Sequence, residues 1–226
     1  MASRVLSFVA GIGLLGCAAQ QPSSESPPEL QSVIVAPVAG PTYEGIAFPV
    51  SHDEWLTCKH VVPGDAPAYE LAGVEFSGRP RLSGAADGLD GDWSLLHGVQ
   101  CPTTPTPVDF ASPLDPGAEA WVVGWRVVGE GADAGYRRWY VKASIGERRN
   151  ASPAWYLDGM AQADNPGLSG APVVMVEQGA ARVIGIYCGV VKQGTSVAGI
   201  DLSERLRNVF LRPQEVTLLM RAQGNE

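Results

Sequence analysis

Short runs of apolar or alternating residues recur along most of the chain, and turn-forming segments separate them. The segments 83–88 and 129–135, rich in Gly, Ala and Asp, are typical of such turns. Runs of this length suit β-strands buried on one or both faces, so the pattern predicts an all-β protein. The expected strands are 44–50, 69–76, 93–97, 121–128, 139–144, 172–176, 183–190 and 195–200.

A helical period of convincing length occurs only near the C-terminal end. Asp201 can cap a helix that has Glu204 three positions on. The residues on one face of this helix would be Leu202, Leu206, Val209 and Phe210. Pro213 then breaks or restarts the helix, and residues 213–226 are expected to form a C-terminal helix or tail.

The first residues resemble an export signal rather than part of the fold. Arg4 precedes an apolar run over 5–15, which is too short to anchor stably across a bilayer. The run ends in Leu14-Leu15-Gly16-Cys17, which is similar to a bacterial lipobox. We therefore expect a lipoprotein signal peptide over 1–16 and a lipidated Cys17. An ordinary signal peptide with an incidental cysteine is the alternative.

Residues 17–40 are expected to form a flexible tether after the lipidated cysteine, because much of this segment consists of Gln, Pro, Ser and Glu. The end of the tether is blurred, since 32–38 could already be a first strand. Lipidation would place the protein in the bacterial cell envelope as a membrane partner, and Ala18 favours the periplasmic face of the outer membrane by resemblance to enteric lipoproteins.

Composition and charge narrow the functional classes. The chain has 226 residues, 45% of them hydrophobic, which is enough for one compact unit or for two small barrels that share an interface. The formal net charge is −8 at pH 7, and the sequence shows no cluster of Lys and Arg. An acidic surface repels phosphate backbones, so nucleic acid is not an expected partner.

After Cys17, three cysteines remain, at positions 58, 101 and 188. Three thiols allow at most one internal disulfide. No Cys-x-x-Cys motif or pair of histidines accompanies them, so a metal site is not expected.

A glycine-rich turn over 165–172 places Ser169 directly before an apolar run. A serine hydroxyl becomes a nucleophile when a base removes its proton and backbone amides receive the resulting oxyanion. Gly167 and Gly170 leave the backbone free to aim such amides. The candidate base is His60 and the candidate acid is Asp92, which stands before another strand-like run.

Three motifs in this order resemble those of trypsin-like serine peptidases of the chymotrypsin fold. They are Thr57-x-x-His60-Val61-Val62, Asp92-x-Ser94-Leu95-Leu96 and Gly167-x-Ser169-Gly170-x-Pro172-Val173. Their spacing is similar to that of short bacterial HtrA-type members, without an appended PDZ domain. The order His, Asp, Ser argues against α/β-hydrolases and subtilisins. The resemblance implies two packed antiparallel β-barrels over 41–212, followed by a C-terminal helix.

The resemblance also implies a secreted, membrane-tethered endopeptidase that acts on protein or peptide substrates without a cofactor. Ser169 would be the nucleophile, His60 the base and Asp92 the orienting acid, with the N–H groups of Gly167 and Ser169 as the oxyanion hole. Ala163 takes the position at the base of the substrate pocket, although the neighbouring Asp164 complicates this assignment. The other residues expected to line the pocket are Tyr187, Cys188 and Gly189. Small or aliphatic residues are the expected preference on the acyl side of the cut.

Two further points follow from the resemblance. Cys58 could lie near Cys188, with Cys58–Cys101 as the other pairing. Leu168, Ala171, Cys58 and Lys59 depart from the residues common in the family. A peptide-binding module that does not cut, an esterase with the same triad, and a structural envelope lipoprotein are the alternative functions.

Overall fold

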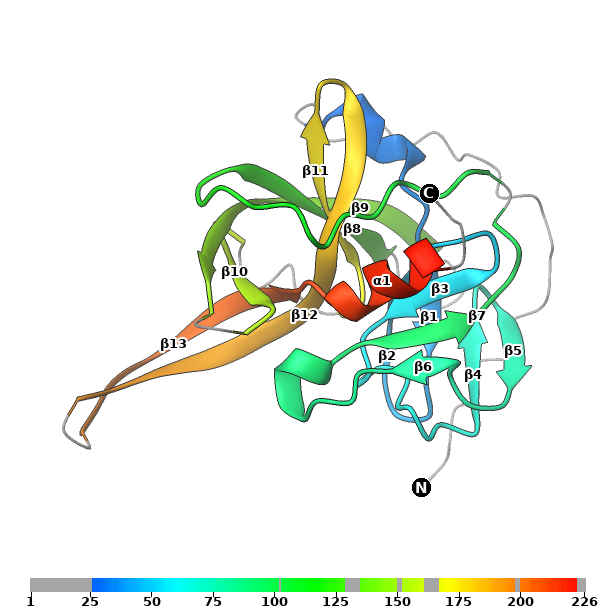
Figure 1. Ribbon diagram of the computed structural model, residues 1–226, viewed down its shortest axis with the longest axis horizontal. Coiled ribbons are helices and arrows are strands. Elements are labelled where there is room, and N and C mark those ends of the chain that lie inside the picture. The colour runs from blue at the N-terminus through cyan, green and yellow to red at the C-terminus, as the bar shows by residue number, and fades with distance from the viewer. Residues whose placement is uncertain are drawn as a thin grey trace.

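The structure is a computed structural model that describes residues 26–101, 103–128, 135–149, 152–160, 167–197 and 200–222 (Figure 1). The expected signal peptide, the lipidation site Cys17 and the pocket residue Ala163 lie outside the described residues. Within the described residues, no helix is long and apolar enough to cross a membrane.

The N-terminal half forms one seven-stranded antiparallel sheet in the order β5-β4-β1-β2-β3-β7-β6. Its central strands carry mostly buried apolar side chains. The sheet therefore supplies the core of this half. The strands are β1 (Ala36–Ala39), β2 (Glu44–Pro49), β3 (Glu54–Thr57), β4 (Ala68–Leu71), β5 (Val74–Ser77), β6 (Leu82–Ser83) and β7 (Ser94–His97).

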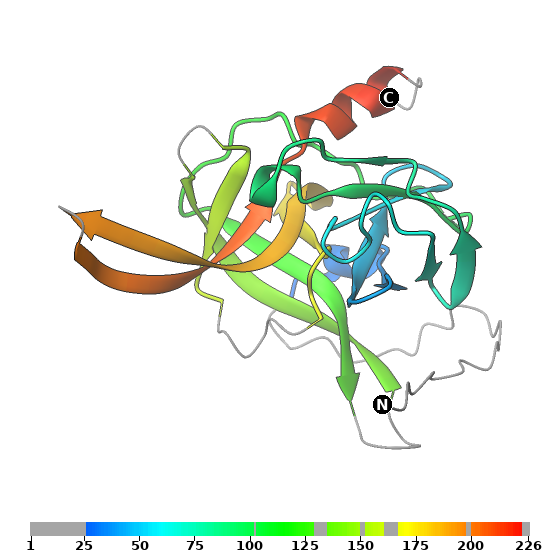
Figure 2. The same cartoon turned by 90° about the horizontal axis from the view of Figure 1, so that it is seen from below.

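The C-terminal half is a closed barrel of six strands in the order β10-β13-β12-β11-β8-β9. Its strands are β8 (Glu119–Val128), β9 (Gly135–Arg148), β10 (Ala154–Asp158), β11 (Pro172–Glu177), β12 (Ala180–Val197) and β13 (Ile200–Leu211). The far end of the β12–β13 hairpin extends well beyond the body of the molecule in both views (Figures 1 and 2). The middle of β12 carries three of the predicted site residues, Tyr187, Cys188 and Gly189.

The prediction of an all-β fold with a C-terminal helix is confirmed, with one difference in detail. The first half is a seven-stranded sheet, and the second half alone is a closed barrel. The C-terminal helix is α1 (Gln214–Ala222), which follows Pro213 and lies on the outside of the molecule (Figure 2), and its own residue Val216 is fully buried.

The helix predicted from Asp201 onward is wrong, because 200–211 is strand β13. This strand pairs along its length with β12 and, at its C-terminal end, with β10. The last three residues of β13, Val209 to Leu211, are all fully buried. A strand buried on both faces gives a continuous apolar run, which resembles a helical stripe in the sequence.

The folded domain also begins before the expected boundary at residue 40. A 3₁₀ helix, η1 (Pro28–Ser32), buries Leu30 completely, and β1 pairs with both β2 and β4. The apolar residues between 30 and 38 therefore belong to the core, and the predicted tether extends too far along the chain.

Candidate active site

His60 lies in a tight turn that follows β3. The N–H groups of Val61 and Val62 both donate to the carbonyl oxygen of Cys58, at 3.1 Å each. Ser94, at the start of β7, is fully buried and donates its hydroxyl to the carbonyl of Val62 at 2.8 Å. The turn is therefore fixed at both ends, while the imidazole ring stays accessible, with 39% of its side chain exposed.

Asp92 binds His60 through both carboxylate oxygens. Its Oδ1 accepts the backbone N–H of His60 at 2.8 Å, and its Oδ2 lies 2.7 Å from the ring Nδ1. A carboxylate only accepts hydrogen bonds, so Nδ1 carries the proton and Nε2 presents a lone pair. The structure thus brings two of the predicted residues together in the geometry of a base and its orienting acid.

The position of Asp92 comes from a short 3₁₀ helix, η2 (Gly88–Gly91). Asp92 follows its last residue and donates its own N–H to Leu89 at 3.1 Å. The strand β7 begins two residues later, so the carboxylate stands at the end of a rigid element. Its side chain is 13% exposed, so the carboxylate is largely buried while the imidazole that it binds stays accessible.

Ser169 lies in a turn that glycines make possible. Gly167 has φ +79° and Gly170 has φ +88°, which is the left-handed region that favours glycine. The turn ends where the N–H of Ala171 donates to Leu168 at 2.9 Å, and β11 starts directly afterwards. Ser169 is half-buried, and its two neighbours, Leu168 and Gly170, are both buried.

The serine turn packs directly on the elements that carry His60. The carbonyl of Ser169 accepts the N–H of Ile46 on β2 at 2.8 Å. A Cβ at Gly170 would lie 2.1 Å from the carbonyl oxygen of Ile46 and 3.2 Å from the N of Cys58, two residues before His60. Such an approach between two backbones requires glycine. The interface between the two halves therefore places the nucleophile candidate beside the base candidate.

Among the described residues, Ser169 and His60 share no hydrogen bond. A nucleophile and its base often stay apart until substrate binds, so this separation is compatible with catalysis. Neither the N–H of Gly167 nor that of Ser169 donates to another described residue. Both groups are the predicted oxyanion hole, which backbone N–H donors of this kind can form.

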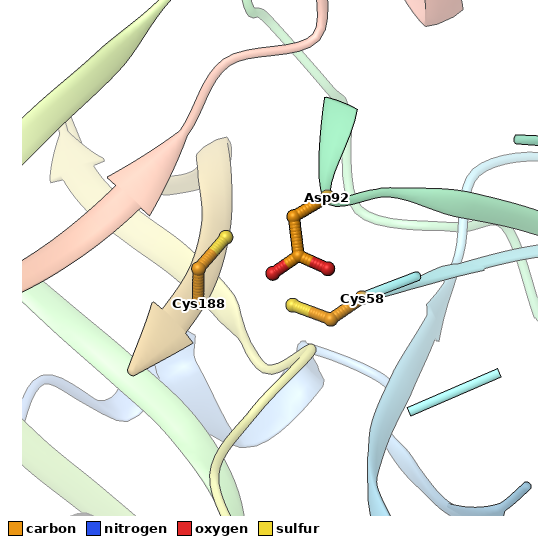
Figure 3. Close-up of side chains that lie close together, drawn as sticks. All are labelled: Cys58, Asp92 and Cys188. Atoms are coloured by element: carbon orange, nitrogen blue, oxygen red, sulfur yellow. The ribbon is translucent and has the colours of Figure 1, made fainter. Parts of the chain in front are cut away.

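The residues predicted to line the substrate pocket have different surroundings. Gly189 lies next to the nucleophile candidate, because a Cβ there would come 3.9 Å from the Oγ of Ser169. Tyr187 is fully buried and donates its hydroxyl to Asn208 at 2.8 Å. The side chain of Cys188 lies close to Asp92 and Cys58 (Figure 3).

One group within the described parts of the chain could hold a metal ion, and it consists of Cys58, Asp92 and Cys188. Their ligand-type atoms all lie within 4.8 Å of one another. Burial, the neighbouring Cys188 and the charge of Asp92 raise the pKa of the Cys58 thiol well above its usual value. The sequence predicted no metal site, because these three residues are far apart in the chain and only the fold brings them together.

Two of the unusual residues have clear structural roles. The Nζ of Lys59 donates to the carbonyl of Gly84 at 2.8 Å, so its charge is held by a loop of the first sheet. Leu168 is 1% exposed, and a Cβ at Gly124 on β8 would lie 2.5 Å from its Cδ2. Leu168 thus anchors the serine turn by burial, a role that sequence reasoning missed.

The structure has two antiparallel β-units side by side, with a His–Asp pair on one and a serine turn on the other. This arrangement is that of the chymotrypsin-like fold, the fold of a large class of serine proteases. The chain has this fold, and solved structures of Rv3671c from M. tuberculosis H37Rv share it. One, a serine-to-alanine mutant in an inactive form, has a TM-score of 0.50 and 20% sequence identity over 84% of this chain and 86% of that chain. A second, the Rv3671c protease in an inactive form, has a TM-score of 0.50 and 20% identity over 83% of this chain and 87% of that chain. No protein-family model matches the chain, and no curated protein sequence matches it.

Proposed function

We propose that the protein is a serine-type endopeptidase that hydrolyses peptide bonds through an acyl-enzyme on Ser169. The observation that carries the proposal is the pair of hydrogen bonds that Asp92 accepts from the backbone N–H and the ring of His60, at 2.8 and 2.7 Å, beside a glycine-rich serine turn. A structural module has no need for an oriented, half-exposed imidazole next to a serine. The solved structures of similar fold include a protein described as a protease, which supports the same activity here.

In the proposed mechanism, the Oγ of Ser169 attacks the scissile carbonyl while Nε2 of His60 takes its proton. His60 later returns that proton to the leaving amine, and water then hydrolyses the acyl-enzyme by the same route. Asp92 keeps the proton on Nδ1 and stabilises the imidazolium as it forms. The N–H groups of Gly167 and Ser169 would receive the oxyanion, where losing one donor typically costs about 3 kcal/mol of barrier.

We further propose that the enzyme prefers small or aliphatic residues on the acyl side of the cut. The support comes from the sequence, in which Ala163 takes the position where an acid would select Lys or Arg. A panel of chromogenic peptides that differ only at this residue tests the preference. Fastest hydrolysis after Arg would contradict it and would point instead to Asp164.

We also propose that Cys17 carries a lipid that tethers the enzyme in the bacterial envelope. The lipobox-like sequence supports this location. Metabolic labelling with an alkyne fatty acid should mark the wild type and not a Cys17→Ala variant. Equal labelling of both chains would contradict lipidation at this residue.

A fluorophosphonate probe tests for the activated serine. The probe should label the wild type covalently and should fail with Ser169→Ala and His60→Ala. Ser77→Ala and His52→Ala are matched controls, because both side chains are exposed on the first sheet away from the triad, and these variants should label normally. A well-folded wild type that resists the probe would favour a peptide-binding module. Turnover of esters without peptide cleavage would favour an esterase.

A further inference from the structure

Two cysteines from different halves of the molecule meet beside Asp92. Cys58 directly follows β3 of the first sheet, and Cys188 lies in β12 of the barrel. Both sulfur atoms and a carboxylate oxygen of Asp92 lie within 4.8 Å of one another, and Figure 3 shows both side chains beside that carboxylate. The Sγ of Cys58 also donates to the carbonyl of Tyr187, the residue before Cys188, at 3.3 Å. The two segments are therefore in direct contact at this point.

The local backbone explains why Cys188 points into this interface. Tyr187 pairs with Phe210 and Gly189 pairs with Val209, so the register of β12 and β13 shifts at Cys188. A β-bulge of this kind re-aims one side chain and leaves it outside the ladder. Cys188 is thereby turned toward the first sheet and lies outside the paired register of β12 and β13.

We propose that Cys58 and Cys188 form a reversible disulfide that cross-links the two halves of the molecule beside Asp92. Both cysteines are free thiols in the structure. A disulfide requires the two sulfur atoms to approach to about 2.05 Å, a movement of the kind that side-chain rotation and a bulged strand allow. The bond would tie the turn that carries His60 to the strand that carries Gly189.

The cross-link forms by exchange with a small-molecule disulfide such as oxidised glutathione. Cys188 is partly exposed, whereas Cys58 is fully buried, so Cys188 reacts first. Its thiolate attacks one sulfur of the oxidant and releases one glutathione thiolate. Cys58 then loses its proton and attacks the sulfur of Cys188, which releases the second. Two protein thiols and one external disulfide thus give one protein disulfide and two glutathione thiols.

The ionisation of the two thiols sets the conditions for the reaction. Burial is the main cause that raises the pKa of Cys58. The hydrogen bond with Cys58 lowers the pKa of Cys188, but burial and the charge of Asp92 raise it more, so the net shift is upward. Both residues are therefore mainly protonated at neutral pH, and exchange should accelerate as the pH rises toward 9.

Peptide mapping of the full chain tests the proposal without relying on hydrolytic activity. The protein is equilibrated at pH 8.5 with oxidised glutathione or with dithiothreitol, in EDTA so that no metal holds the thiols, and then alkylated. Digestion with trypsin and a glutamate-specific protease separates the cysteines, because 55–59 contains Cys58, 82–119 contains Cys101 and 183–192 contains Cys188. A cross-linked pair of 55–59 with 183–192 is expected in the oxidised sample alone.

Variants and thermal unfolding complete the test. Cys101→Ala is the matched control, because Cys101 is also fully buried, and it should keep the cross-link. Cys58→Ala and Cys188→Ala should lose it. Oxidation should raise the Tm of the wild type by roughly 5–15 °C, since the bond closes a loop of about 130 residues. Complete alkylation of both cysteines after oxidation, or a cross-link of Cys58 with Cys101, would overturn the proposal.

Discussion

Leu168 packs over Gly124, and this contact sets the position of the serine turn. Leu168 is 1% exposed and stands directly before Ser169, while Gly124 lies in the middle of β8. A Cβ at Gly124 would come 2.5 Å from the Cδ2 of Leu168, which is too close for two carbon atoms that are not bonded to each other or to a common atom. Because Gly124 has no side chain, the barrel has room for Leu168, which anchors the turn of the candidate nucleophile.

This fit predicts a strong coupling between positions 124 and 168. Gly124→Ala should displace Leu168, and with it Ser169, so that both the Tm and the rate of fluorophosphonate labelling fall. Leu168→Ala alone should cost about 2–5 kcal/mol of stability through the cavity it leaves. The double variant should be more stable than the sum of the single effects predicts, by about 0.5–3 kcal/mol. Additive effects in urea unfolding would contradict the contact.

The hydrogen bond between Asp92 and the ring of His60 predicts the effect of a neutral substitution. Asp92→Asn keeps the shape of the side chain, but its amide can donate to Nδ1 and stabilise the wrong tautomer. We expect kcat to fall by about 10³–10⁴-fold on a chromogenic peptide substrate, with the fold intact by circular dichroism.

Asp87→Asn is the matched control for this variant, because Asp87 is an exposed aspartate that precedes the same 3₁₀ helix. Its kcat should equal that of the wild type. An Asp92→Asn enzyme within tenfold of the wild type would show that Asp92 does not orient the base.

Ser94 should support catalysis without touching substrate, because it fixes the far end of the histidine turn. Its hydroxyl donates to the carbonyl of Val62 at 2.8 Å in a fully buried position. Ser94→Ala should leave that carbonyl unpaired and cost about 1–3 kcal/mol of stability. Because the turn is loosened, kcat should fall as well. Ser83→Ala is the control, since the hydroxyl of Ser83 contacts the hydroxyl of Ser94 and leaves the bond to Val62 in place. Equal losses in both variants would argue against this role.

The order of three short windows and their resemblance to a known family allowed the candidate site residues to be named from the sequence. The windows around His60, Asp92 and Ser169 each encode a turn or strand entry within a few residues, so their identity does not depend on distant partners. The contacts that surround these windows, in contrast, depend on residues far away in the sequence. The position of Cys188 depends on a bulge between β12 and β13, and the role of Leu168 depends on Gly124 in another strand. Neither relationship leaves a local signal.

The incorrect prediction of a helix after Asp201 has the same cause, which is a dependence on distant partners. The apolar residues of 200–211 fit a helical face, and nothing within that segment opposes a helix. The chain instead forms β13, because this strand pairs along its own length with residues 186–197 of β12 and closes the barrel against β10. Tertiary pairing of this kind overrides local propensity, and it becomes visible only when the partner strands are placed.

The ion pair between Asp109 and Arg182 predicts how the protein responds to acid. Asp109 precedes the barrel, and its carboxylate binds the guanidinium of Arg182 on β12. Burial raises the pKa of Asp109, but hydrogen bonds from Ser112 and Ala111 and the charge of Arg182 outweigh it, so that the net pKa is about 2. A pKa lowered by folding means that the native state is stabilised while the carboxylate is ionised.

The stabilisation from Asp109 is therefore complete above pH about 4 and is lost as the pH falls through about 2. Asp109→Asn should lower the free energy of unfolding at pH 7 by about 1–2 kcal/mol. The gap between variant and wild type should close as the pH falls from 4 to 2, as measured by urea unfolding at each pH. Asp115→Asn, at an exposed position of the same connecting segment, should show no such gap. A constant difference between Asp109→Asn and the wild type at every pH would mean that the loss comes from packing and not from the charge.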